Sequence, residues 1–151
     1  ELMRYFDPQL EGTDDFLPQI GTLSGNPIAA AAGLATLHEL KKPGSYARLF
    51  ATGRRVRLGL EMALQAAELP AQVVGIDPLF DVLFTEEPLL NYRAILTADA
   101  ARLRQFTSLL VDRGVFKGAT KFYVSLAHTE EDIQKTLEVF HEAAQTMAHR
   151  L

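Results

Sequence analysis

Two periods of apolar spacing alternate along this 151-residue chain, and together they leave few folds open to it. Long stretches repeat apolar residues every three or four positions, which is the period of a helix with one buried face. Short runs between them are rich in β-branched and aromatic residues, which favour strands. The expected order is two helices, two strands, a helix, two strands and a last helix. That order predicts an α+β domain in which helices cover a small sheet.

The expected helices have recognisable ends. The first, which is rich in alanine, begins with Asn26 as N-cap and Pro27 at the first helical position. The last begins with a capping box at Thr129, and Gly114 stands where a left-handed C-terminal cap belongs. Residues 1–20 lack a steady period, and we expect them to be irregular. The helices are expected over residues 27–40, 46–67, 97–113 and 129–148. The strands are expected over residues 72–76, 80–85, 115–116 and 122–126.

Composition excludes several classes of protein. The formal net charge of −4 argues against nucleic-acid binding, which needs a basic surface. There are no cysteines, so disulfides and thiolate metal sites are ruled out. No apolar run reaches the roughly 20 residues that span a bilayer, and the acidic start does not read as a signal peptide. We therefore expect a soluble, cytoplasmic protein without a membrane partner.

One segment could bind a ligand, namely the loop Gly21-Thr22-Leu23-Ser24-Gly25 that runs into the alanine-rich helix at Asn26. A helix N-terminus presents unpaired backbone N–H groups and the positive end of the helix dipole, which suit an oxyanion such as phosphate. Gly21 would let the backbone approach the anion closely, and Thr22 would add a hydroxyl donor. On chemistry alone, a helix cap with turn residues and no ligand is the other interpretation.

The segment from Gly21 to Leu34 resembles the corresponding motif of class III pyridoxal-phosphate-dependent aminotransferases of the glutamate-1-semialdehyde aminomutase kind. Three further segments are similar to this family in the same order. They are Val74-Gly75 with Leu83-Phe84-Thr85, Pro88 and Asn91-Tyr92; Arg113-Gly114-Val115-Phe116; and Ser125-Leu126-Ala127-His128-Thr129-Glu130-Glu131-Asp132-Ile133 with Thr136-Leu137. The resemblance thus covers nearly the whole chain.

The resemblance implies the C-terminal small domain of a fold type I enzyme, with a small, mainly antiparallel sheet. It implies a homodimer that binds pyridoxal 5'-phosphate and transfers an amino group between a small-molecule donor and acceptor. Thr22, with Gly21 beside it, would contact the cofactor phosphate of the neighbouring subunit. No lysine here stands in the context of the family's catalytic lysine, so we expect that lysine in an upstream large-domain segment and assign no catalytic residue to this chain.

The resemblance also implies three parts: residues 1–26 as the end of the large domain, 27–68 as connecting helices and 69–151 as the small domain. The region around Phe116–Phe122 looks shorter than in the aminomutases, which leaves aminomutase and transaminase reactions equally open. A non-catalytic dimerisation or binding domain that kept the fold, and a class III racemase or decarboxylase, remain alternatives.

Other polar residues receive structural interpretations. We expect His128 to form a structural hydrogen bond, and no metal site, because the histidines lack ligand spacing. Lys117 and Lys121 could meet a substrate carboxylate, but we expect both to face solvent. The same solvated interpretation applies to four carboxylates and three arginines. They are Asp77, Asp81, Glu86, Glu87, Arg54, Arg55 and Arg57.

Overall fold

The structure, a computed structural model, describes residues 2–18, 21 and 23–149. The chain divides into two compact units, Glu1–Lys42 and Pro43–Leu151. The three parts expected from the sequence stay a prediction.

The first unit is built around one long helix, α1 (Pro27–Lys41). As predicted, Asn26 is its N-cap and Pro27 opens its first turn. The segment expected to be irregular contains two short 3₁₀-helices, η1 (Leu2–Phe6) and η2 (Pro8–Leu10). None of the described residues of α1 is buried.

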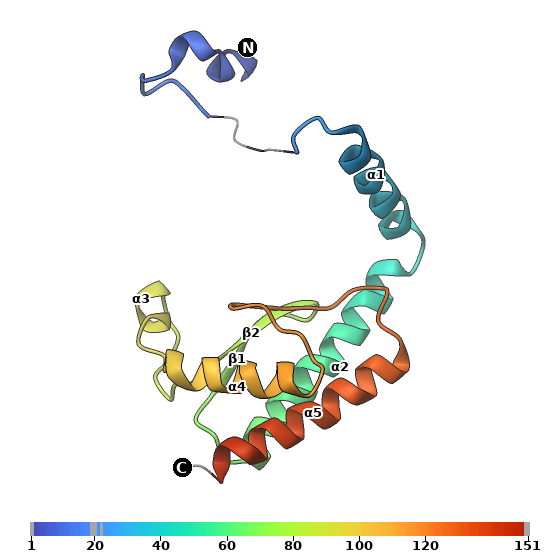
Figure 1. The fold of residues 1–151 in the computed structure, drawn as a ribbon, viewed down its shortest axis with the longest axis vertical. Coiled ribbons are helices and arrows are strands. Elements are labelled where there is room, and N and C mark those ends of the chain that lie inside the picture. Colours follow the sequence, from blue (N-terminus) through green and yellow to red (C-terminus); the bar gives the residue numbers. More distant parts are fainter. Residues whose placement is uncertain (1, 19–20, 22, 150–151) are drawn as a thin grey trace. The chain divides into compact units, whose positions relative to one another are not determined.

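The second unit has the predicted α+β architecture, a small antiparallel sheet with helices packed beside it (Figure 1). Its sheet is antiparallel in the order β1-β2-β3, and Phe80 of β2 lies opposite Phe122 of β3. Helices α2 and α5 pack side by side, and α4 packs on α5. The elements are α2 (Ser45–Ala66), β1 (Gln72–Ile76), β2 (Leu79–Leu83), α3 (Tyr92–Ile95), α4 (Ala100–Asp112), β3 (Phe122–Tyr123) and α5 (Glu130–Ala148).

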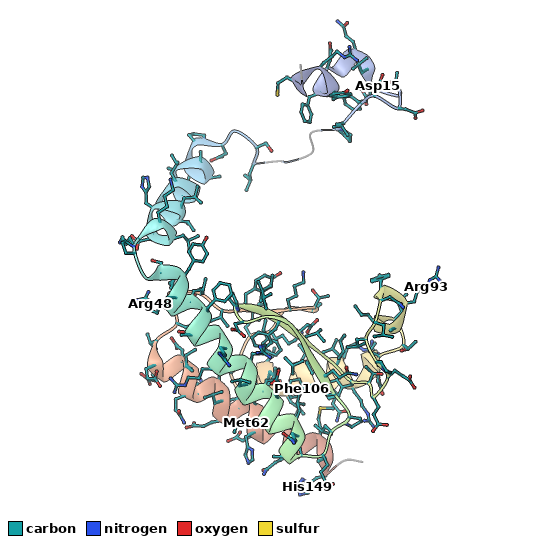
Figure 2. All side chains as sticks on the ribbon, turned by 180° about the vertical axis from the view of Figure 1, so that it is seen from behind. Asp15, Arg48, Met62, Arg93, Phe106 and His149 are labelled. Atoms are coloured by element: carbon teal, nitrogen blue, oxygen red, sulfur yellow. The ribbon has the colours of Figure 1, made fainter. Side chains whose placement is uncertain are left out.

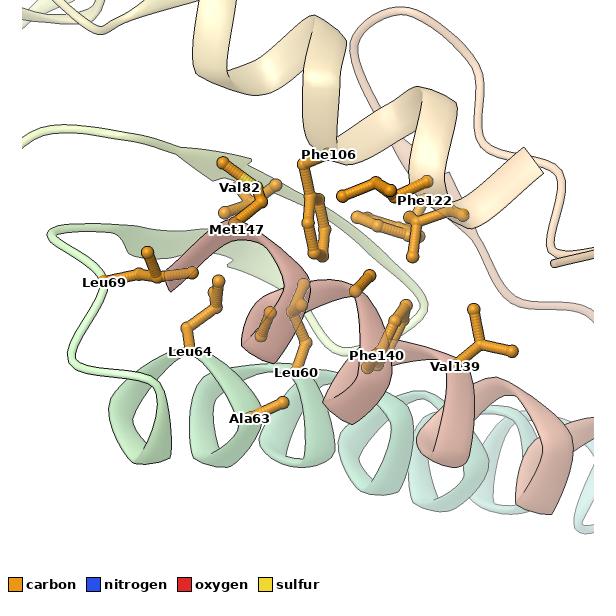
Figure 3. Packing of buried hydrophobic residues seen from close by; sticks show 14 of the residues in the cluster. Leu60, Ala63, Leu64, Leu69, Val82, Phe106, Phe122, Val139, Phe140 and Met147 are labelled. Carbon is orange, nitrogen blue, oxygen red and sulfur yellow. The ribbon is translucent and has the colours of Figure 1, made fainter. Parts of the chain in front are cut away.

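One core joins these elements (Figure 3). Leu60 from α2, Phe106 from α4 and Phe140 from α5 point into it and are fully buried. The ring of Phe106 packs edge-on against Phe84, and the ring of Phe140 packs edge-on against Phe122. Aromatic pairs of this kind stabilise a fold by about 0.5–1.5 kcal/mol beyond the contribution of the apolar area that they bury. All the residues of this core belong to the second unit, in which Figure 2 labels Phe106.

The helix ends follow the predicted signals closely. Thr129 and Asp132 form the capping box of α5, and the Asp132 Oδ2 atom accepts the Thr129 N–H at 2.8 Å. Gly114 closes α4 with a left-handed backbone, φ +85°, and the Val115 N–H donates to the Leu110 carbonyl at 2.9 Å. Helix α4 begins three residues later than predicted, at Ala100, because the Asp99 carboxylate caps its first turn.

The predicted strand at residues 115–116 is wrong, and the predicted strand at 122–126 is reduced to Phe122–Tyr123. The Val115 N–H donates to the Leu110 carbonyl at the end of α4 and the Val115 side chain packs against the core, while Phe116 is exposed. Only Phe122 and Tyr123 of β3 pair with β2. Beyond Tyr123 the apolar Val124 packs against the core, which explains the alternating pattern without further strand pairing. The short helix α3 has no counterpart in the prediction.

Helix α2 and the β1–β2 turn approach each other closely at Gly53. A Cβ atom at this buried position would collide with the backbone of Asp77 and Pro78. The Arg57 side chain fixes the same contact, because its Nε donates to Asp77 Oδ1 at 2.9 Å. The hairpin is therefore held against α2 by both shape and charge.

Candidate functional site

The loop before α1 turns twice within the six residues 21–26. The Ser24 N–H donates to the Gly21 carbonyl at 3.1 Å, and the Asn26 N–H donates to the Leu23 carbonyl at 3.0 Å. Gly25 takes a left-handed backbone, φ +75°, that favours glycine. The Ser24 hydroxyl occupies the place that a Cβ of residue 21 would need. Gly21 is exposed, and Thr22 lies outside the described residues.

The N-terminus of α1 is closed by the chain itself. Asn26 Oδ1 accepts the N–H groups of Ile28 at 2.9 Å and Ala29 at 3.1 Å. Pro27 has no N–H, and the Ala30 N–H donates to the Asn26 carbonyl at 3.0 Å. The expectation that this helix offers unpaired N–H groups is therefore wrong for its first turn. Any anion held here must lie before the cap, next to Gly21 and Thr22.

The donor set before the cap suits a doubly negative group. Residues 21–29 contain no carboxylate, and the segment provides backbone N–H groups and the hydroxyls of Thr22 and Ser24. An acid among them would repel a phosphate. The chemistry of these residues fits a phosphate group, although the structure does not describe Thr22.

The sequence interpretation missed a buried ion pair. Lys117 is only 3% exposed, and its Nζ lies 3.1 Å from Asp81 Oδ1 on β2. The same ammonium group donates to the Gly118 carbonyl at 3.1 Å and lies 5.0 Å from the centre of the Phe122 ring. The prediction that Lys117 and Asp81 are solvated is wrong. Nothing local could reveal the pair, because its partners lie far apart in sequence.

Two arginines of α2 also form specific ion pairs. Arg57 contacts Asp77 and Glu61, which raises the pKa of its guanidinium, chiefly through the hydrogen bond to Asp77. Asp77 is thus another carboxylate wrongly expected to be solvated. Arg55 is bidentate to Glu130 at 2.5 and 2.6 Å, and this hydrogen bond lowers the pKa of Glu130. These two arginines therefore tie α2 to the β1–β2 turn and to the start of α5.

His128 has the structural role that the sequence predicts. Its Nδ1 accepts the Ser125 N–H at 3.0 Å. Among the residues that the structure describes, no group of three His, Asp or Glu side chains could hold a metal ion. Within the same residues, no helix is both long and apolar enough to cross a bilayer.

Two cavities lie in the second unit. One, of about 550 Å³, is mostly apolar and opens between the β1–β2 hairpin and the start of α4, with Val74, Phe84 and Leu103 in its wall. The other, of about 600 Å³, lies beside β3 and α5 and has Lys121, His128 and Lys135 in its wall. Lys121 borders both cavities and, as predicted, is exposed.

Comparisons with known proteins give one consistent answer. No family profile matches the sequence. Glutamate-1-semialdehyde 2,1-aminomutase 2 of Brevibacillus brevis is 41% identical over 128 residues, which are 83% of this chain and 30% of the relative. The aminomutase of Desulfosudis oleivorans is 36% identical over 140 residues, which are 91% of this chain and 32% of the relative.

Solved structures agree with these relatives. An omega-transaminase from Sphaerobacter thermophilus superposes with a TM-score of 0.75 at 29% identity and covers 97% of this chain. A transaminase with bound pyridoxal phosphate gives 0.72 at 25% identity and covers 98% of it. The chain spans about a third of the length of each, and its sheet and helices match their C-terminal part. The chain therefore belongs to the class III pyridoxal-phosphate-dependent aminotransferase family and corresponds to its C-terminal part.

Proposed function

We propose that this chain is the C-terminal part of a pyridoxal-phosphate-dependent amino-group transferase, an aminotransferase or aminomutase that acts on an amino acid or amino aldehyde. The supporting observation is the similarity to aminomutases at 36–41% identity over 83–91% of the chain. Since the relatives are about three times as long, we assign the catalytic lysine to the part of the protein that this chain does not include.

When bound, pyridoxal phosphate supplies the electron sink that lets an amino group leave one carbon and join another. In this proposal, the Thr22 hydroxyl and the Gly21 backbone hold the phosphate of a neighbouring subunit in a homodimer. These two residues bind and orient the phosphate, and they transfer no proton. The exposed loop with neutral donors and no carboxylate supports this assignment.

The closed N-terminus of α1 limits how the phosphate can be held. Because Asn26 uses the first N–H groups of the helix, hydrogen bonds to phosphate must come from the loop before it. The helix then contributes through its dipole, whose positive end still faces that loop. This arrangement makes Thr22 the donor whose loss should matter most.

Substitution of Thr22 tests the site. In the intact protein, Thr22→Ala removes one hydrogen bond to a charged group and should weaken cofactor retention by about 1.5–3 kcal/mol. Thr22→Ser keeps the hydroxyl and should retain the cofactor nearly as the unchanged protein does. Cofactor release is followed by equilibrium dialysis and by visible absorbance. Equal retention in all three proteins would remove Thr22 from the site.

Mixed dimers test the assignment to a neighbouring subunit. One subunit carries Thr22→Ala and the other carries a substituted catalytic lysine. If the phosphate contact crosses the interface, the lysine-bearing subunit keeps an intact phosphate site from its partner, and half of the sites in the mixed dimer stay active. If the contact is made within one subunit, every site in the mixed dimer lacks either the lysine or the threonine.

A non-catalytic domain that kept the fold is the alternative from another class. The intact protein would then stay colourless after incubation with pyridoxal phosphate, whereas an enzyme of this family absorbs visible light. A racemase or decarboxylase would absorb as well and is distinguished by its products. The cytoplasmic location expected from the cysteine-free composition belongs to this proposal too.

A further inference from the structure

Gly21 and Ser24 fit against each other in the loop before α1. A Cβ atom on residue 21 would collide with the Ser24 hydroxyl oxygen, whereas it would lie 3.5 Å from the Ser24 Cβ, which is ordinary contact. Unlike Gly25, Gly21 does not have a left-handed backbone. Its conformation therefore does not call for glycine. What calls for glycine is the Ser24 hydroxyl, which fills the space that a side chain of residue 21 would take.

The backbone joins the same two residues. The Ser24 N–H donates to the Gly21 carbonyl at 3.1 Å, which closes a turn between them. A closed turn restricts the backbone of the residues that it contains. In the sequence, Thr22 stands between Gly21 and Ser24. These contacts lie within a few consecutive residues, so they do not depend on what the rest of the protein adds around the loop.

Two other roles that a serine could have at this place are filled or blocked. Helix α1 is capped by Asn26, whose Oδ1 accepts two N–H groups of the first turn, so Ser24 is not the cap. A backbone N–H carries a single hydrogen, and that of Ser24 already donates to the Gly21 carbonyl. The backbone of Ser24 is therefore not a donor to phosphate.

We propose that Ser24 is a positioning residue for the phosphate contact. Its hydroxyl, packed on Gly21, and its N–H hold the turn in the shape that lets Thr22 reach the cofactor phosphate. Ser24 itself does not contact the phosphate. The proposal rests on the proposed function of Thr22. It also gives Gly21 a second role, because the missing side chain makes room for the Ser24 hydroxyl.

The test compares the affinity of the intact protein for pyridoxal phosphate with its affinity for pyridoxal, which lacks the phosphate. Equilibrium dialysis measures both. The ratio of the two affinities reports on the phosphate contact, because the ligands share the same ring and aldehyde. Ser24→Ala should lower the ratio about fivefold, since a misplaced donor loses roughly one ordinary hydrogen bond. Ser108→Ala, the same change at an exposed position of α4, should leave the ratio unchanged.

Gly21→Ala tests the fit between the two residues. The new methyl group should displace the Ser24 hydroxyl and lower the ratio about as much as Ser24→Ala does. The double variant should lose no more than either single variant, because the new Cβ then meets only the Cβ of residue 24 at 3.5 Å. Losses that add in the double variant would contradict the pairing of Gly21 with Ser24.

Thr22→Ala separates positioning from direct contact. If Ser24 acts through Thr22, Ser24→Ala should lower the ratio no further in the Thr22→Ala protein. A second fivefold loss there would mean that Ser24 binds phosphate itself, and the proposal would be wrong. It would also be wrong if Thr22→Ala lowered the ratio and Ser24→Ala did not, and the proposed function would then still stand. An unchanged ratio in Thr22→Ala would overturn both.

Discussion

The Lys117 ammonium group and the Asp81 carboxylate lie 3.1 Å apart in a place where the lysine side chain has no exposed surface. Removing one partner of such a pair leaves an uncompensated buried charge, which costs about 3–5 kcal/mol. Replacing both partners with apolar residues of similar volume is often nearly neutral. The pair therefore secures the segment between α4 and β3 to the sheet.

Asp81→Leu alone should lower the free energy of unfolding by about 3–5 kcal/mol. The double variant with Lys117→Met should recover much of this loss, because no charge then remains buried. Urea unfolding followed by circular dichroism measures both. Lys117→Met alone completes the comparison. If the losses of unfolding free energy in the two single variants simply add in the double variant, the two side chains are not coupled and the ion pair contributes little.

Two helical glycines should respond oppositely to alanine. Gly53→Ala should destabilise by about 1–3 kcal/mol, because its Cβ would collide with the backbone of Asp77 and Pro78. Gly33→Ala, on exposed α1 with no atom near the new methyl group, should stabilise its helix by about 0.5–1 kcal/mol. Thermal unfolding of both variants makes the comparison. A harmless Gly53→Ala would contradict the close packing of α2 against the hairpin.

Stability should fall in acid through Asp132 and Glu130. Hydrogen bonds from the Thr129 backbone and side chain lower the pKa of Asp132, and the hydrogen bond from Arg55 lowers that of Glu130. A lowered folded-state pKa stabilises the fold above the unfolded pKa, and that contribution is lost as pH falls through the folded value. The loss should thus begin near pH 4–5. Unfolding midpoints against pH should be flatter for Asp132→Asn, and an unchanged slope would argue against the capping box.

Asn26→Asp should separate helix capping from phosphate binding. Aspartate caps a helix about as well as asparagine, so the helix content should stay the same by circular dichroism. The added charge would lie beside a bound phosphate and should weaken cofactor retention by on the order of 1 kcal/mol. Asn26→Ser, a neutral cap, is the matched control. Full retention in the aspartate variant would place the phosphate away from this loop.

The sequence predicts the helices and the hairpin well because their signals are local. Asn26 and Thr129 cap the helices they were expected to cap, and Gly114 takes the left-handed backbone of a C-cap. The short helix α3 escaped notice because four residues give no period to recognise. Phe116 looked like a strand residue, but no strand among the described residues pairs with it, and strand pairing is a long-range property.

The candidate sites were harder to predict, again for physical reasons. The burial of Lys117 depends on Asp81 of β2, and the partial burial of Asp77 depends on Arg57, 20 residues away. A single sequence shows charges but not their partners. The loop at Gly21 was recognisable because glycine, hydroxyl and cap residues stand next to one another. That Asn26 uses the N–H groups of the helix itself required the structure.

The self-capped start of α1 determines whether this helix stays folded when no cofactor is bound. A helix that needs an anion to close its first turn melts when the anion departs, and each rebinding must restart the helix. Here the side-chain amide of Asn26 closes that turn without an anion. When the cofactor leaves the neighbouring phosphate site and binds again, α1 therefore does not have to nucleate anew. The protein without cofactor should keep α1 folded.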